Sequence, residues 1–261
     1  MEAPNIPVKE DERLDRVNES ILLLQKKDGL TFGTDAFLLA SYVRPEPASC
    51  GVDLGSGTGI LPLLLLARKK AAFLTAVEVQ PSFAELIEKN ATINGRQESI
   101  RVLPADLREL SAKDLGKEVD FVISNPPYLK ANVGKMNRSD EKGIARHELS
   151  GDIFDFCAAA DRLLKYGGRF YTVYHPERLA DLMAALRENH LEPKRMTLVY
   201  PDEISKPCLV LTEAQKGAKS SLFITRPLFL YTLESRAGKA RKLTKDAEAI
   251  YDTASFASFE K

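Results

Sequence analysis

Four consecutive residues, Asn125-Pro126-Pro127-Tyr128, are well suited to act on a planar amino group. They follow the apolar run Phe121-Val122-Ile123, so we predict that they lie where a buried strand ends. An amide or exocyclic amine has N–H hydrogens to donate while its lone pair is delocalised, and two fixed acceptors would hold it by those hydrogens. The Asn125 Oδ1 atom and the Pro126 carbonyl are candidates, because the prolines restrict the backbone around them. Tyr128 adds an aromatic face for stacking; the alternative is an ordinary Pro-Pro turn with a capping asparagine.

A glycine-rich loop lies further upstream. Cys50–Leu54 is predicted to be a short strand, Gly55-Ser56-Gly57-Thr58-Gly59 a loop, and residues 60–68 a helix with Pro62 in its first turn. Strand, glycine loop and helix form the first unit of a doubly wound sheet, in which ligands bind beyond the carboxyl ends of the strands. The glycines let the backbone approach a ligand closely, and the helix start offers unpaired N–H groups.

The loop spacing and the acidic residues near it favour a cofactor other than a dinucleotide. The glycines follow G-x-G-x-G, whereas a dinucleotide site prefers G-x-G-x-x-G. Asp53 would repel phosphate but could accept from an ammonium group or, through water, help to hold a sulfonium cofactor. Glu78 ends the apolar run 71–77 and could accept both ribose hydroxyls. Asp106 follows the run 100–103 and could accept from an adenine amino group, or else cap a short helix.

With these motifs, the chain resembles the class I S-adenosylmethionine-dependent methyltransferases that carry an N-P-P-Y signature. More narrowly, it resembles the bacterial valine-tRNA adenine methyltransferases, which modify the adenosine on the 3′ side of the anticodon. The resemblance covers roughly residues 12–230 with the motifs in the right order. N-P-P-Y itself is shared by several amino-group methylases. The segments that carry the narrower resemblance are 28–40, which contains Phe32-Gly33-Thr34-Asp35, then Glu78-Val79-Gln80-Pro81, Asn90-Ala91-Thr92-Ile93-Asn94-Gly95 and Ala145-Arg146-His147-Glu148.

The resemblance implies roles for individual residues. S-adenosylmethionine would be the cofactor, and Asn125, Pro126 and Tyr128 would position the target amino group. An N-terminal helix would close over the site and bring Thr34 and Asp35 to the cofactor, although these two could simply cap that helix. The cofactor-binding set implied in this way is Thr34, Asp35 and Asn125, with Asp53, Gly55 and Gly57 at the methionine portion, Glu78 at the ribose and Asp106 at the adenine.

The order of the elements predicts a Rossmann-like class I methyltransferase fold. We expect a mostly parallel, seven-stranded α/β sheet with helices on both faces and a short N-terminal extension. Residues 1–45 would be that extension, closing over the cofactor site, 46–230 the catalytic domain, and 231–261 a basic tail packed on it or trailing from it. The polar segment 130–150 is long for a strand-to-helix connection and could gate the site. Beyond the fourth strand, Val119–Ser124, we expect a helix at 153–164 ended by Gly167-Gly168, a strand at 169–174 and a helix at 176–189. Antiparallel closing strands are expected near 195–199, 208–211 and 222–225.

The overall charge does not favour a nucleic-acid partner. Thirty-seven basic residues balance thirty-seven acidic ones, and the pI is about 6.9. A tRNA substrate therefore depends on local basic patches, one within 130–146 and one within 236–245, each of which could instead be a solvated surface segment. The candidate RNA contacts are Lys130, Lys135, Arg138, Arg146, Lys239, Arg241 and Lys242.

The composition fits a cytoplasmic globular protein. The chain has 261 residues, 44% of them hydrophobic, which is enough for one domain with a full core. It has no long apolar run, and its charged first residues do not resemble a signal peptide. The three cysteines and three histidines are scattered, without the spacing of metal ligands, so no metal is expected.

The function favoured by these residues is direct methyl transfer to the exocyclic amino group of a tRNA adenosine, beside the anticodon of valine tRNA. Two alternatives stay open. A protein glutamine methyltransferase acting on release factors meets the same amide geometry, but such enzymes normally carry a separate N-terminal helical domain, whereas residues before 46 match the tRNA family. A non-catalytic RNA-binding protein of the same fold is the other alternative, and the set Asp53, Glu78, Asp106 and Asn125 argues against it.

Overall fold

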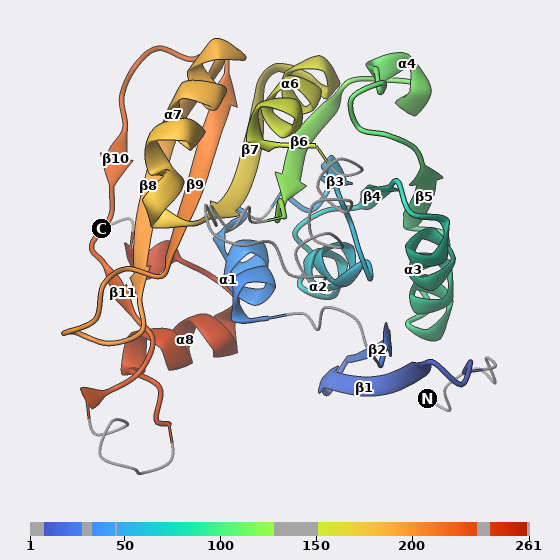
Figure 1. Cartoon of the computed structure of the whole chain (residues 1–261), viewed down its shortest axis with the longest axis horizontal. Helices are drawn as coiled ribbons and strands as arrows, with labels where there is room; N and C mark the ends of the chain where they lie inside the picture. Colours follow the sequence, from blue (N-terminus) through green and yellow to red (C-terminus); the bar gives the residue numbers. More distant parts are fainter. Residues whose placement is uncertain (1–7, 28–32, 45, 128–150, 234–240, 260–261) are drawn as a thin grey trace, which may run out of the picture.

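A computed structural model of the chain describes residues 8–27, 33–44, 46–127, 151–233 and 241–259. Within these residues, nine strands form one sheet and two more form a separate antiparallel hairpin (Figure 1). Seven main strands run in the order β5, β4, β3, β6, β7, β9, β8 across the sheet, and two short strands, β10 and β11, both pair with β8. The strands of the large sheet are β3 (Cys50–Leu54), β4 (Phe73–Glu78), β5 (Ile100–Pro104), β6 (Val119–Ser124), β7 (Leu164–Tyr174), β8 (Leu191–Tyr200), β9 (Leu209–Lys216), β10 (Phe223–Ile224) and β11 (Leu228–Phe229).

This arrangement confirms the predicted fold class. β9 is antiparallel to both of its neighbours, β7 and β8, while the other pairings in the large sheet are parallel. The strand predicted near 222–225 is present as β10, but it lies parallel to β8. β10 and β11 therefore extend the predicted seven strands at one edge.

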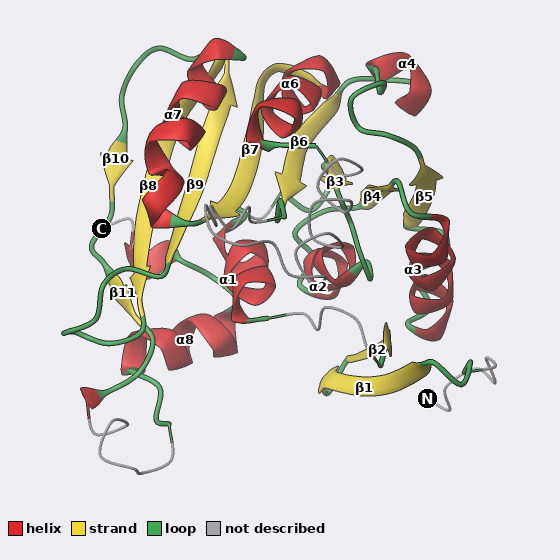
Figure 2. Ribbon diagram, in the orientation of Figure 1, coloured by secondary structure: helices red, strands yellow, loops and turns green. Residues whose placement is uncertain are grey.

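Helices cover both faces of the sheet (Figure 2). One hydrophobic cluster joins the sheet to four helices on one face, and a second joins it to two helices on the opposite face. The helices on the first face are α1 (Thr34–Tyr42), α2 (Ile60–Ala67), α3 (Pro81–Ile93) and α8 (Lys245–Thr253), and those on the second are α6 (Ile153–Leu163) and α7 (Leu179–Glu188). Short helical turns are α4 (Ala112–Leu115), η1 (Pro176–Arg178) and η3 (Ala257–Phe259).

Gly167 and Gly168 lie inside β7, and not at the end of the preceding helix, which corrects the predicted boundary. A Cβ atom on Gly168 would lie 2.9 Å from the Lys165 carbonyl oxygen and 3.0 Å from the Asp120 carbonyl oxygen. The register between β6 and β7 also shifts at this level. The missing side chain of Gly168 therefore lets the backbones of β6 and β7 approach each other closely, next to the register shift between these strands.

The hairpin of β1 (Glu12–Asn18) and β2 (Ile21–Lys26) is attached to α3 and its C-cap by the side chains of Asn90 and Asn94. Asn90 accepts from the Leu24 N–H at 2.6 Å and donates to the Leu24 carbonyl at 2.9 Å. Asn94 makes the same pair of bonds with Leu22, at 3.0 and 2.7 Å. Asn90 also donates to the Thr58 carbonyl at 2.9 Å, so the hairpin is tied to the glycine loop as well. These contacts give a structural reason for the two asparagines of the segment 90–95.

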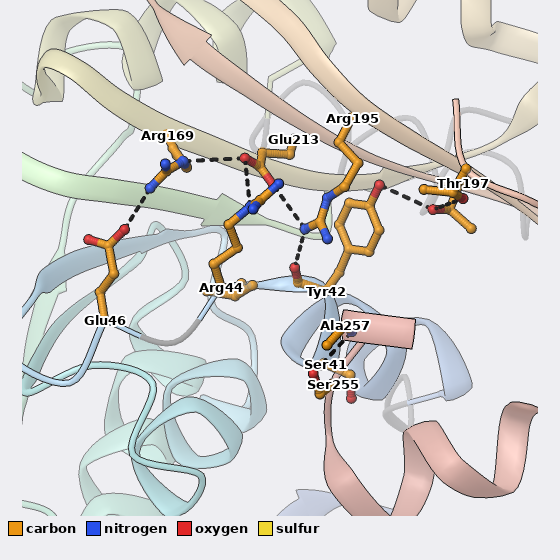
Figure 3. Close-up of polar contacts among 12 residues, drawn as sticks. Ser41, Tyr42, Arg44, Glu46, Arg169, Arg195, Thr197, Glu213, Ser255 and Ala257 are labelled. Atoms are coloured by element: carbon orange, nitrogen blue, oxygen red, sulfur yellow. Dashed lines mark hydrogen bonds and ion pairs between the residues drawn. The ribbon is translucent and has the colours of Figure 1, made fainter. Parts of the chain in front are cut away.

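The end of α1 is fixed by an ion cluster around a buried glutamate (Figure 3). Glu213, on β9, is 3% exposed and pairs with the guanidinium groups of Arg44, Arg169 and Arg195, at 3.0, 3.2 and 2.8 Å. Arg195 also donates to the Tyr42 carbonyl at 2.6 Å, and its guanidinium lies 3.9 Å from the centre of the Tyr42 ring. The last turn of α1 is thus held to the antiparallel part of the sheet.

Lys70 satisfies the carbonyls at the same helix end. Its Nζ atom donates to the carbonyl oxygens of Ala40, Ser41 and Val43, at 2.9, 2.7 and 2.5 Å. We expect Lys70→Met to lower the free energy of unfolding by roughly 1.5–3 kcal/mol, because it leaves buried carbonyls without their charged donor. Urea unfolding measures this, with Lys69→Met as the control because Lys69 is exposed. An unchanged midpoint for Lys70→Met would contradict it.

Candidate active site

The candidate site lies at the carboxyl ends of β3, β4 and β6. The chain runs from β3 outward to β4 and β5, and then returns to β6 on the other side of β3. The loops after β3 and β6 therefore leave the sheet in opposite directions from adjacent strands, which is where open α/β sheets bind ligands. The predicted glycine loop follows β3, and Asn125 follows β6 directly.

Asp53, the penultimate residue of β3, is fully buried. The Ser56 hydroxyl donates to its Oδ2 atom, while its Oδ1 atom has no hydrogen-bond partner among the described residues. Burial raises the pKa of Asp53 to about 7; the Ser56 hydrogen bond opposes this shift, and the charge of Glu78 adds to it. A buried acceptor without a partner is costly, so this oxygen is suited to receive a donor from a ligand.

The glycine loop turns sharply between β3 and α2. Gly55, Gly57 and Gly59 have φ values of +72°, +55° and +77°, a region that side chains disfavour. A Cβ atom on Gly57 would meet nothing within 4 Å, so the loop borders open space at this point. The predicted strand, loop and helix thus occur in the expected order, with Pro62 in the first turn of α2.

Glu78, the last residue of β4, is brought to the same loop. Its Oε2 atom accepts from the Gly57 N–H at 2.9 Å, and its Oε1 atom accepts from the Gln80 N–H at 3.0 Å. The side chain is largely buried, since the residue is only 5% exposed. Two backbone donors therefore hold this carboxylate in a fixed orientation beside Gly57.

Asp106 lies beyond the end of β5, as predicted, but its carboxylate is engaged locally. It accepts from the Arg108 backbone N–H at 2.9 Å and forms an ion pair with the Arg108 guanidinium at 2.5 Å. This pairing lowers the pKa of Asp106. Asp106 directly precedes a turn at 107–109 and bonds a backbone N–H of it, so its carboxylate caps this turn and not a described helix. Among the described residues, its hydrogen bonds and its ion pair do not join it to Glu78 or Asp53.

Asn125 is brought together with Asp35. The Asn125 Nδ2 atom donates to Asp35 Oδ2 at 2.9 Å, although the two residues are 90 positions apart. Asp35 lies in the first turn of α1, and the N-cap is Gly33, without a side-chain capping bond. The Asp35 Oδ1 atom accepts from the Ala36 N–H at 2.9 Å, so Asp35 bonds the first turn of the helix as well as Asn125. The following Pro126 is buried.

Some predicted residues lie outside the described part of the chain. These are Tyr128 and the basic residues Lys130, Lys135, Arg138, Arg146 and Lys239. Arg241 and Lys242 are described, and both are exposed. The Arg241 guanidinium lies 5.3 Å from the centre of the Tyr231 ring.

The structure adds contacts that the sequence did not indicate. Ser56 is the hydroxyl partner of Asp53, and its place three residues later in the loop was the only available signal. The direct contact of Asp35 with Asn125 had no local signal, because it depends on how α1 packs.

Among the described residues, no group of three or more histidine, cysteine or acidic side chains could hold a metal ion. The same residues include no helix with the length and apolar character needed to cross a bilayer.

Similar solved structures share this fold. A predicted O-methyltransferase from Agrobacterium tumefaciens is 23% identical with a TM-score of 0.67, and the match covers 85% of this chain and 97% of that one. The geranyl diphosphate C-methyltransferase of Streptomyces coelicolor, in complex with Mg²⁺, geranyl diphosphate and S-adenosylhomocysteine, is 15% identical with a TM-score of 0.51, covering 69% and 79% of the two chains. At these identities the similarity shows the fold. The fold, with ligand-accepting residues at its switch point, is that of a class I methyltransferase.

The chain belongs to the methyltransferase small domain family, whose model matches residues 27–190. It is similar to the tRNA1(Val) (adenine(37)-N6)-methyltransferase of Porphyromonas gingivalis, at 29% identity over 188 residues, covering 69% of this chain and 72% of the relative. The protein of the same name from Aeromonas hydrophila is 33% identical over 150 residues, covering 57% and 61%. These matches confirm the predicted methyltransferase class and the resemblance on which it was based.

Proposed function

We propose that the protein transfers a methyl group from S-adenosylmethionine to the exocyclic amino group of a tRNA adenosine, beside the anticodon of valine tRNA. The hydrogen bond between Asn125 and Asp35 is the observation that carries this proposal, because it fixes an amide acceptor at the switch point. The names of the relatives, which are tRNA1(Val) (adenine(37)-N6)-methyltransferases, support the same substrate. A tRNA substrate also agrees with the predicted cytoplasmic location.

The residues around the glycine loop fit this cofactor. The buried Oδ1 atom of Asp53 can accept from the cofactor's ammonium group, directly or through water. Glu78 can accept from the ribose hydroxyls while it keeps its two backbone donors, since each carboxylate oxygen has two lone pairs. Asp106 is the candidate acceptor for the adenine, and it would share its carboxylate with Arg108. Gly55 and Gly57 would let the loop backbone approach the methionine portion.

Asp35 sets the direction of the Asn125 carboxamide. A carboxylate accepts hydrogen bonds and has none to donate, so the amide atom that faces it is Nδ2. The planar amide then directs Oδ1, its acceptor, away from Asp35. Oδ1 and the Pro126 carbonyl can bind the two hydrogens of an amino group, and Tyr128 would stack against the base. Both acceptors also stabilise the positive charge that develops on the nitrogen during transfer.

The reaction we propose is a direct displacement. S-adenosylmethionine supplies a methyl group on a positively charged sulfur, which is already a strong electrophile. The contribution of the chain is therefore to align the two reactants. Asn125 and Pro126 hold the amino group by its hydrogens and reduce the conjugation of the nitrogen lone pair with the ring. A general base is not required before transfer, because the proton can leave the alkylated nitrogen afterwards. An unpaired anticodon-loop base is also easier to splay out than a paired one.

The substrate is tested by methylation of total tRNA from a strain that lacks this gene. The purified protein and labelled S-adenosylmethionine are incubated with the tRNA, which is then digested and analysed by mass spectrometry. We expect N6-methyladenosine, located beside the anticodon of valine tRNA. Label in a release factor in a parallel reaction, and none in tRNA, would favour a glutamine methyltransferase. No label in either would contradict a catalytic role.

A further inference from the structure

The C-terminal segment 245–259 packs along α1, although it lies outside the matched family region 27–190. The ring of Tyr251, on α8, stacks on Phe37 with a centroid separation of 4.4 Å and an interplanar angle of 12°. Further along α1, Phe256 meets Tyr42 edge-on at 5.0 Å. The segment therefore contacts α1 near both of its ends, and Figure 1 shows α8 beside α1.

Tyr251 also reaches the first turn of α1. The side chain of Thr34, the first residue of the helix, interacts with its hydroxyl group and opposes the rise that burial causes in the pKa of Tyr251. The next residue, Asp35, holds the amide of Asn125. A continuous series of contacts thus leads from α8, through the first turn of α1, to the asparagine after β6.

The start of α1 has no N-cap side chain. Its N-cap is Gly33, and the first-turn donor at Ala36 is instead bonded from within the turn, by Asp35 Oδ1 at 2.9 Å. Helix ends fray, and fraying here would move Asp35 relative to Asn125. The ring and hydroxyl of Tyr251 hold this turn from the side, at Phe37 and Thr34.

We infer that Tyr251 is a positioning residue for methyl transfer: it fixes the first turn of α1 and, through it, the hydrogen bond by which Asp35 orients Asn125. This inference rests on the proposed function, in which Asn125 holds the target amino group. Tyr251 touches neither substrate nor cofactor in this scheme. Its removal should lower the rate of transfer and leave the binding of tRNA unchanged.

The test compares Tyr251→Phe, which keeps the ring, with Tyr251→Ala, which removes it. We expect kcat for tRNA methylation to fall about 3- to 10-fold for Tyr251→Phe, the effect of one hydrogen bond, and about 100-fold for Tyr251→Ala, where the turn is displaced. The KM for tRNA should change by less than about twofold. Tyr166→Phe is the matched control, because that hydroxyl donates to the Gly217 carbonyl at 2.9 Å, near the start of β7.

A double-mutant cycle with Thr34→Val isolates the hydroxyl contact. If the pair acts together, Tyr251→Phe has no further effect on kcat once Thr34 is replaced. Additive effects would overturn the role of this hydrogen bond. The cycle also tests the role of Tyr251 if Tyr251→Ala does not fold, because it uses only Tyr251→Phe and Thr34→Val. An unchanged kcat in both Tyr251 variants, or a parallel loss of kcat, substrate binding and the urea midpoint, would overturn the inference.

Hydrogen exchange separates this inference from the proposed function. The amides of residues 38–41 donate to carbonyls of the first turn of α1, so their exchange reports whether that turn is held. We expect faster exchange in Tyr251→Ala than in the wild type, and no change in Tyr166→Phe. If the wild-type protein methylates no tRNA, the proposed function fails, while this measurement still shows whether Tyr251 fixes α1. Unchanged exchange would overturn the inference.

Discussion

Asn125→Ala should lower methyl transfer to tRNA by about 10²–10³-fold, while S-adenosylhomocysteine still binds with nearly unchanged affinity. The substitution removes the acceptor that we assign to the amino group, and it also removes the bond to Asp35. It leaves Asp53 and Glu78 in place at the glycine loop. A methyl-transfer assay measures the first quantity, and calorimetry with S-adenosylhomocysteine measures the second.

The matched control is Asn189→Ala. The Asn189 amide donates to the Ala185 carbonyl at the end of α7, on the face of the sheet opposite α1. This variant should turn over at the wild-type rate. An unchanged rate of methyl transfer in Asn125→Ala would contradict the assignment of Asn125 as the residue that binds the target amino group. A loss of affinity for S-adenosylhomocysteine equal to the loss in rate would instead make Asn125 mainly a cofactor-binding residue.

The affinity for S-adenosylhomocysteine should rise with pH and level off near pH 7, because of Asp53. Burial raises the pKa of this carboxyl group to about 7 in the free protein, so below that pH it is mostly protonated. A ligand whose ammonium group favours the carboxylate lowers this pKa and releases a proton on binding. The affinity therefore falls by up to about tenfold for each pH unit below 7.

Calorimetry between about pH 5.5 and pH 7.5, below the titration of the ligand's own amino group, measures this effect. Parallel runs in two buffers of different ionisation enthalpy count the released proton. Asp53→Asn keeps an acceptor for Ser56 but should bind about 10- to 100-fold more weakly at the upper pH and lose the pH dependence. Asp120→Asn is the control, since Asp120 accepts from the Cys50 N–H at 2.7 Å at the opposite end of β3. A pH-independent affinity in the wild type would refute this role for Asp53.

The central strands and the loops after them could be predicted from the sequence, for a physical reason. Parallel strands covered on both faces are nearly continuous apolar runs, so a polar residue at the end of such a run marks the strand's carboxyl end. The predicted strand Val119–Ser124 agrees with β6 at both ends, and Glu78 is the last residue of β4. Asp53 and the glycine loop were placed by the same pattern.

The remaining features depend on packing between distant segments. The residues next to Arg195 and Glu213 in the sequence give no sign that these two side chains meet, and only the structure shows that both are buried and paired. The contact of Asp35 with Asn125, like that of Tyr251 with Phe37, depends on the position of α1 on the sheet. Gly168 shows the limit of local rules, because the same residue type ends helices and permits close backbone contact within a strand. The roles assigned to the site residues stay predictions until the variants are measured.

Asn90 of α3 and Asn94, its C-cap, also protect an edge of the N-terminal hairpin. A strand edge with unpaired N–H and C=O groups is a template on which other chains can add a strand, and this is a common route to aggregation. On the outer edge of β2, those groups at Leu22 and Leu24 are taken up by Asn94 and Asn90. Their carboxamides offer the donor and acceptor that a neighbouring strand would supply. A helix thereby closes the edge of the hairpin, and no foreign strand can pair at these two positions.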